Sequence, residues 1–132
     1  MIVLTNPNAQ VVQPGNPILF TQIAEKEACC PGISPSGASV KLSSNSQHRI
    51  DFNANVNGAA GTQANLAVAL CGEAIPWTTI VATIVADTDV HNIGIGFHLK
   101  QCCTDFNRVS IINTGSTAIN VSAYPMLAID KR

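Results

Sequence analysis

Charged residues are scarce in this sequence. Lys, Arg, Asp and Glu make up 11% of its 132 residues, whereas about 25% is usual in soluble domains. The formal net charge is −1 and no run of Lys or Arg occurs, so the chain lacks the basic surface of a nucleic-acid-binding protein. Its two basic spots, Lys26 and the pair Lys131 and Arg132, are too small for a polybasic membrane anchor. Low charge is typical of obligate assemblies, whose subunits bury apolar area against one another.

Long uninterrupted apolar segments are also missing. The first ten residues, MIVLTNPNAQ, have no basic start and no long apolar run, so they do not resemble a secretion signal. The apolar stretch 64–86 is interrupted in its middle by Gly72, Glu73, Pro76 and Trp77. Two strands joined by a turn explain this pattern better than a membrane span does. We therefore expect no membrane partner and synthesis in the cytoplasm.

The cysteines do not form the even, spaced set of a secreted disulfide framework. There are five cysteines. Four form two pairs of sequence neighbours, Cys29 with Cys30 and Cys102 with Cys103, and the fifth is Cys71. Neighbouring cysteines rarely bridge each other, because the ring strains the peptide between them. We expect reduced thiols that act as small buried hydrophobes. Bridges between the two pairs, or across a trimer, remain the alternative.

Helix signals are nearly absent, and strand signals recur at a spacing typical of all-β proteins. The one helical candidate, 21–30, stops at Pro31 and Gly32 and allows one short turn at most. We expect strands at 16–23, 39–42, 48–56, 64–71, 78–86, 90–99, 108–113 and 117–129. Since no strand–helix alternation occurs, we do not expect a parallel sheet. The prediction is an all-β, antiparallel two-sheet jelly-roll sandwich over 16–132, preceded by an N-terminal arm or edge strand over 1–15.

Two of these segments carry informative face patterns. In 48–56 the alternation predicts a core face with Ile50, Phe52, Ala54 and Val56, and an opposite face with Arg49, Asp51, Asn53 and Asn55. In 90–99 the polar face carries Asn92, Gly94, Gly96 and His98. Two glycines there indicate either close approach of a neighbouring chain or a bulge. Segments 64–71 and 78–86 are apolar on both faces, as expected for strands covered on two sides, and Pro125 belongs at a bulge or an edge.

Chemistry-bearing residues do not assemble into a recognisable site. No cysteine or histidine spacing matches a zinc site, and His91 and His98 are seven residues apart, which places them on opposite faces of one strand. Asp87 and Asp89 offer oxygens to calcium, but too few, and we interpret them as solvated turn residues. No residue orients a base toward a Cys nucleophile. We expect no enzyme activity, no metal and no cofactor.

Trp77 is the single tryptophan and follows Pro76 at a strand connection. An exposed ring could stack on a sugar, whereas a lone tryptophan more often closes the end of a sandwich core. We expect the core position, and the sugar-stacking alternative stays open.

Several stretches carry a family resemblance. They are NPILFT at 16–21, the pair Cys29 and Cys30, FNANVNGAAG at 52–61, LAVALCGEAIP at 66–76, the pair Cys102 and Cys103 before VSIINT at 109–114, and INVSA at 119–123. Together they resemble the small tumour-necrosis-factor/C1q-like (TNF/C1q-like) jelly-roll virion proteins of phages and prophages of Gram-positive gut bacteria. The resemblance covers about residues 16–129. FHLKQ at 97–101 departs from the proline- or glycine-containing lead-in to the cysteine pair that is usual there.

The resemblance implies a compact homotrimer in which one sheet of each subunit faces the threefold axis. It implies a virion structural protein, made in the cytoplasm of the bacterial host, that serves as capsid decoration or head fibre and has other virion proteins as partners. The alternative is a tail-associated receptor- or glycan-binding module that contacts a host surface glycan. The candidate subunit-interface residues are Asp51, Asn53, Asn55, Gly94, Gly96, His98 and Tyr124.

Overall fold

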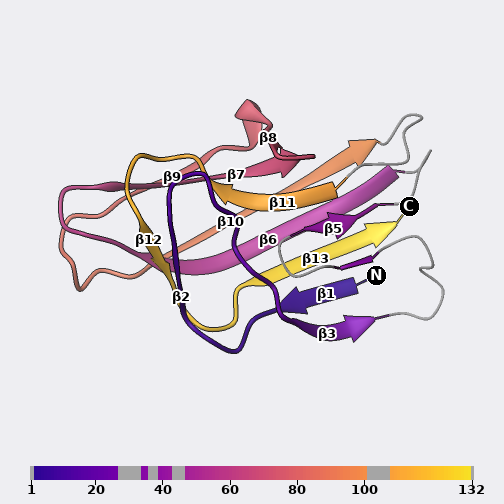
Figure 1. Ribbon diagram of the computed structural model, residues 1–132, viewed down its shortest axis with the longest axis horizontal. Helices are drawn as coiled ribbons and strands as arrows, with labels where there is room; N and C mark the ends of the chain where they lie inside the picture. The colour runs from indigo at the N-terminus through magenta and orange to yellow at the C-terminus, as the bar shows by residue number, and fades with distance from the viewer. Residues whose placement is uncertain (1, 27–33, 36–38, 43–46, 101–107, 132) are drawn as a thin grey trace.

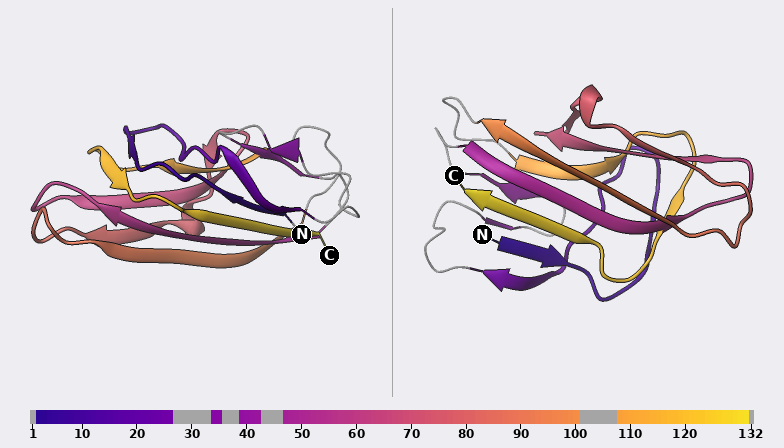
Figure 2. Two further views of the ribbon diagram at one scale, coloured as in Figure 1. Left: turned by 90° about the horizontal axis from the view of Figure 1, so that it is seen from below. Right: turned by 180° about the vertical axis from the view of Figure 1, so that it is seen from behind.

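The structure, a computed structural model, describes residues 2–26, 34–35, 39–42, 47–100 and 108–131. Two antiparallel sheets stack face to face in this part of the chain (Figures 1 and 2). Sheet A contains β1 (Ile2–Thr5), β2 (Gln10–Val12), β3 (Gln22–Lys26), β6 (Gln47–Asn57), β10 (His91–Lys100), β12 (Ile119–Val121) and β13 (Met126–Lys131). Sheet B contains β4 (Ser34–Pro35), β5 (Val40–Lys41), β7 (Gln63–Leu70), β8 (Glu73–Ala74), β9 (Ile80–Thr83) and β11 (Arg108–Asn113). The predicted all-β, two-sheet antiparallel architecture is confirmed.

The long strand β6 is the centre of sheet A. β10 pairs with one edge of β6 in a continuous register that runs from His91 opposite Val56 to Lys100 opposite Gln47. β13 and β12 follow one another along the other edge. Further out, β1 lies between β13 and β3, and β2 pairs with β12. The continuous register of β10 shows that its two glycines do not form a bulge.

Strand β7 has the central place in sheet B. β11 pairs with one edge of β7, and the short strands β8 and β9 share the other. A single 3-10 turn, Pro76–Thr78, connects β8 to β9. The buried hydroxyl of Thr78 accepts the N–H of Val68 at 3.0 Å and donates to the carbonyl of Ile75 at 2.7 Å. The Thr78 hydroxyl therefore satisfies the Val68 N–H of β7 at the point between its two short partner strands, β8 and β9.

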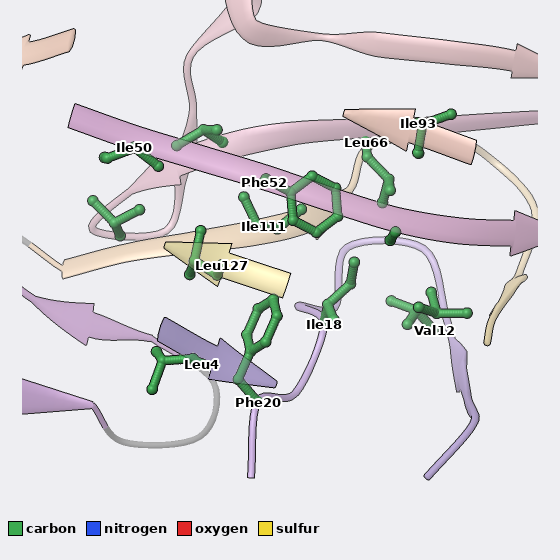
Figure 3. Close-up of a cluster of buried hydrophobic side chains, with 14 of the residues drawn as sticks. Leu4, Val12, Ile18, Phe20, Ile50, Phe52, Leu66, Ile93, Ile111 and Leu127 are labelled. Atoms are coloured by element: carbon green, nitrogen blue, oxygen red, sulfur yellow. The ribbon is translucent and has the colours of Figure 1, made fainter. Parts of the chain in front are cut away.

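The hydrophobic core lies between the sheets and matches the predicted strand faces. Ile50, Phe52, Ala54 and Val56 are all at most 2% exposed, which confirms the register assigned to 48–56. Figure 3 shows Phe52 among side chains from both sheets, including Leu66 and Ile111 of sheet B and Leu127 of sheet A. In β7 both faces are buried, as predicted for 64–71, since Leu66, Ala67, Val68 and Ala69 are at most 1% exposed.

Three predicted strands differ from the structure, each around a proline or an edge. In 16–23 the strand begins only at Gln22, because Pro17 has no N–H to donate and forms an isolated bridge with Ile112. The segment 117–129 is two strands, since the chain breaks at 122–125 before Met126. The segment 78–86 narrows to the edge strand β9, and its outer face is not covered, since Val81 is 53% exposed.

Other predictions fall near the chain's beginning. The helical turn proposed for 21–30 is wrong over Gln22–Lys26, which is strand β3, and its remainder lies outside the described residues. The segment 1–15 supplies two strands to sheet A: β1 inside the sheet, with Ile2 and Leu4 buried, and β2 at its edge. Its separation from 16–132 as a unit of its own stays a prediction. Among the described residues, no helix has the length and apolar character needed to cross a membrane.

Candidate interaction surface

The outer face of β6 and β10, turned away from the core, carries six of the seven candidate residues. β6 presents Asp51, Asn53 and Asn55 on the side opposite Phe52, because side chains alternate along a strand. β10 presents Gly94, Gly96 and His98, all exposed, opposite Asn53, Asp51 and Arg49 respectively. β13 continues the same face with Met126 opposite Asn53 and Ala128 opposite Asp51. We call this three-strand surface the sheet A outer face.

Asparagine amides form a connected network on this face. Asn92 Nδ2 donates to Asn53 Oδ1 at 2.9 Å and to Asn55 Oδ1 at 3.0 Å. Asn53 Nδ2 returns a bond to Asn92 Oδ1 at 3.3 Å. The pairing follows from the register, which sets Asn92 directly opposite Asn55. Three amides are thus held in fixed orientations while they remain exposed to solvent.

The two glycines create a shallow depression beside this network. A Cβ atom at Gly94 would lie 2.9 Å from the carbonyl oxygen of Phe52, and one at Gly96 would lie 2.5 Å from Asp51 Oδ1. At Gly94 the closest atom is backbone, so a side chain there would force the strands apart, whereas at Gly96 the Asp51 carboxylate would have to rotate away. β6 of the same chain therefore lies close to both glycines, and the close approach of a neighbouring chain stays a prediction. A hollow of about 570 Å³ lies over this region and extends to Met126 and Ala128.

Two charged groups on the face, Arg49 and Asp51, form an ion pair within the subunit. Arg49 Nε donates to Asp51 Oδ2 at 3.1 Å, and both side chains are partly exposed. In register, Arg49 also lies between His98 on β10 and Asp130 on β13. The face as a whole therefore offers amides, small side chains and an internally compensated ion pair.

Tyr124, the seventh candidate, lies apart from the β6–β10 pair. It sits in the connection between β12 and β13, with a φ of 64° and an exposed fraction of 68%. Its N–H donates to the carbonyl oxygen of Asn6 at 2.8 Å, which fixes this connection to the chain that follows β1.

Trp77 is exposed, so the expectation that it closes the core is wrong. Its side chain is 67% exposed and packs edge-to-face on Phe97 of β10, with 5.5 Å between the ring centroids. The 3-10 turn carries Trp77 outward because the neighbouring Thr78 takes the buried position under β7. One face of an indole is thus held out from the β10 margin of the sandwich.

The remaining chemical candidates form no cluster where the chain is described. Across residues 2–26, 34–35, 39–42, 47–100 and 108–131, no three His, Cys, Asp or Glu side chains gather as a metal site would require. Asp89 instead completes a turn, since its Oδ2 accepts the N–H of Ala86 at 3.1 Å. Cys71 is exposed, so the expected buried role is wrong for this residue. Cys29, Cys30, Cys102 and Cys103 lie outside the described residues.

Sequence reasoning missed three members of the sheet A outer face: Asn92, Met126 and Ala128. Asn92 was available from the alternation of 90–99, which already placed it with Gly94 and Gly96. Met126 and Ala128 could not be predicted, because no local pattern says which strand pairs with the second edge of β6.

No protein-family model matches the chain, and no curated protein matches it. Solved structures do. The globular domain of the zebrafish complement 1qA protein aligns with a TM-score of 0.60 at 10% identity and covers 95% of this chain and 93% of its own. The PRD1 vertex protein P5 aligns with a TM-score of 0.55 at 14% identity, and the alignment covers 99% of this chain and 94% of that protein's chain.

The fold is a C1q-like jelly roll. The predicted fold class is therefore confirmed. At such low sequence identities, no functional residue of either protein is assigned to a position in this chain. Within this jelly roll, sheet A is the layer that holds both chain ends, since Ile2 of β1 pairs with Ile129 of β13 (Figure 1).

Proposed function

We propose that the chain is a phage virion structural protein that works as a homotrimeric capsid-decoration or head-fibre module. The observation that carries this proposal is the sheet A outer face, where three paired strands present an ordered asparagine network and a hollow of about 570 Å³. Such a face offers hydrogen-bond donors and acceptors, and a concave surface, to a second subunit. The low charge of the whole chain supports the same conclusion.

The polar groups of this face suit a threefold axis. On such an axis each side chain meets copies of itself, so an unpaired charge would face like charges. Arg49 and Asp51 neutralise each other within one subunit, which lowers that repulsion. The ordered amides of Asn53 and Asn92 have both donors and acceptors, so they can bond to identical copies at little further cost in side-chain entropy.

The structural similarities support a virion role without establishing it. The PRD1 vertex protein P5 shares the fold over nearly the whole chain, so a jelly roll of this kind occurs among phage virion proteins. The complement 1qA domain shares the fold as well. Since one fold serves several functions, the virion role must be tested on the protein itself.

The trimer is tested by light scattering coupled to size exclusion. The expected mass is three times the 13.8 kDa of one chain. Asn53→Arg places a long cation at the centre of the sheet A outer face and should yield folded monomer. Thr83→Arg is the matched control, because Thr83 is an exposed strand residue on sheet B, and it should remain trimeric. A monomeric wild type, or a trimeric Asn53→Arg variant, would contradict the proposed interface.

Imaging of intact phage particles tests the virion location. The proposal expects density for this jelly roll on the capsid surface. Density confined to the tail tip would favour adhesion instead, and absence of the chain from purified particles would refute both virion assignments.

A tail-associated glycan-binding module is the second candidate, and the exposed ring of Trp77 favours it. An exposed indole that packs edge-to-face on Phe97 is a suitable platform for the apolar face of a sugar. Binding on a glycan array should disappear in Trp77→Ala and persist in part in Trp77→Phe, which retains a ring. Equal array signals for the wild type and Trp77→Ala would exclude this platform.

A further inference from the structure

A second hollow, of about 460 Å³, opens on the outer face of sheet B. Its floor is β11, where Val109 and Ile111 point into the core, so that Ser110 and Ile112 point outward into the hollow. Arg108, at the start of the same strand, lines one end. This volume lies within the range of about 300–1,000 Å³ that small-molecule sites occupy.

Two glycine turns form the sides of the hollow and keep it open. On one side the segment with Gly15 and Pro17 is fixed along β11, since the Gly15 N–H donates to Asn113 O at 2.7 Å and Pro17 bridges Ile112. On the other side the Cys71–Gly72 turn is fixed by the Cys71 N–H, which donates to Arg108 O at 2.8 Å. Gly15 and Gly72 both have positive φ, 82° and 87°, so side chains are disfavoured where they would narrow the hollow.

The floor contains a polar group without a counterpart. Ser110 is only 9% exposed, and no described residue forms a hydrogen bond with its hydroxyl. The hydroxyl is not among the fully buried polar atoms that lack a partner, and it is available to donate to or accept from a molecule in the hollow. Since Ser110 faces the hollow, a bound molecule can supply the partner.

The lining also specifies the charge of that molecule. Arg108 is an exposed guanidinium, and no Asp or Glu is among the described residues around the hollow. A guanidinium matches a carboxylate in a bidentate arrangement. Pro17 and Ile112 add apolar walls, which a simple inorganic anion would leave uncovered. We propose that this hollow binds a small organic carboxylate with an apolar body, the carboxylate on Arg108 and Ser110 and the body between Pro17 and Ile112.

The site is independent of the proposed trimer, because it lies on sheet B and the sheet A outer face lies on the opposite side of the sandwich. The test is a titration of ¹⁵N-labelled full-length protein with 3-phenylpropionate. Saturable shifts are expected at the amides of Gly15, Gly72 and Ser110. 3-Phenylpropionamide, which keeps the body without the charge, should bind at least about tenfold more weakly, since hydrogen bonds to charged groups are the stronger ones. Phenyl phosphate tests whether another anion replaces the carboxylate.

Variants separate the two polar contacts. Arg108→Gln should weaken 3-phenylpropionate binding about tenfold or more, and Arg108→Lys by less, because it keeps the charge but loses the planar fork. Ser110→Ala should weaken it about threefold to tenfold, whereas Ser116→Ala, an exposed serine outside the hollow, should have no effect. The proposal is overturned by non-saturable shifts, by shifts elsewhere on the surface, by equal affinity for the amide, or by tighter binding of phenyl phosphate. Loss of the trimer in light scattering would leave this result unchanged.

Discussion

Replacing Phe52 with alanine should destabilise the subunit by about 3–5 kcal/mol. Phe52 is 2% exposed and lies in β6, which is paired along both edges. In register its neighbours are Ile95 on β10 and Leu127 on β13. Because both neighbouring strands are fixed by their own pairing, the cavity left by the ring cannot close easily, and the cost should fall in the upper part of the range for aromatic truncations.

The measurement is urea unfolding at a fixed protomer concentration, since the stability of an oligomer depends on concentration. The loss corresponds to a fall in Tm of roughly 10–20 °C for a chain of this size. Asn53→Ala is the matched control one residue along, with an exposed side chain, and should cost about 1 kcal/mol or less in the subunit. Its larger effect is expected on oligomer mass. A loss below about 1 kcal/mol for Phe52→Ala would refute the strand register, because a slip by one residue moves the ring to the surface.

Three further outcomes are expected. Thr78→Val should cost about 1–3 kcal/mol in urea unfolding, because it leaves the Val68 N–H unsatisfied, whereas Thr79→Val, at an exposed hydroxyl, should stay within about 0.5 kcal/mol of wild type. Cys71→Asn should raise stability by a few tenths to about 1 kcal/mol, since the positive φ values of Cys71 and Gly72 form the turn that Asn-Gly favours; a lower Tm would contradict that turn type. EDTA should leave the Tm unchanged, and a fall of more than about 5 °C would indicate a metal.

Local alternation was enough to predict the centre of the fold. The period-2 pattern of 48–56 placed Phe52 in the core and Asn53 on the opposite face, and the pattern of 90–99 did the same for Ile93 and Gly94. These two strands pair with each other over their whole length, and this long-range pairing, which the alternation does not predict, brings their exposed residues together. That is why six of the seven candidate residues share one surface.

Long-range contacts decided what sequence patterns could not. The segment 117–129 looks like one strand, yet it divides at 122–125, because Pro125 has no N–H to donate and the Tyr124 N–H bonds to Asn6, far away in sequence. The position of Trp77 depends on Thr78, whose hydroxyl takes the place beneath β7. In both cases a partner from another part of the chain overrides the local preference.

Asn113 illustrates how a local signal can hide a long-range role. Asn113, Thr114 and Gly115 have turn composition, and the expected Asx contact is present, since the Gly115 N–H donates to Asn113 Oδ1 at 3.0 Å. The sequence gives no reason to bury this residue, yet Asn113 is 0% exposed. Its Nδ2 donates to Val12 O at 3.0 Å and to Thr117 O at 2.9 Å. One amide therefore joins β2 of sheet A to the end of β11 in sheet B. This polar contact anchors the N-terminal segment to the sandwich, and a hydrophobic pattern in the sequence cannot predict it.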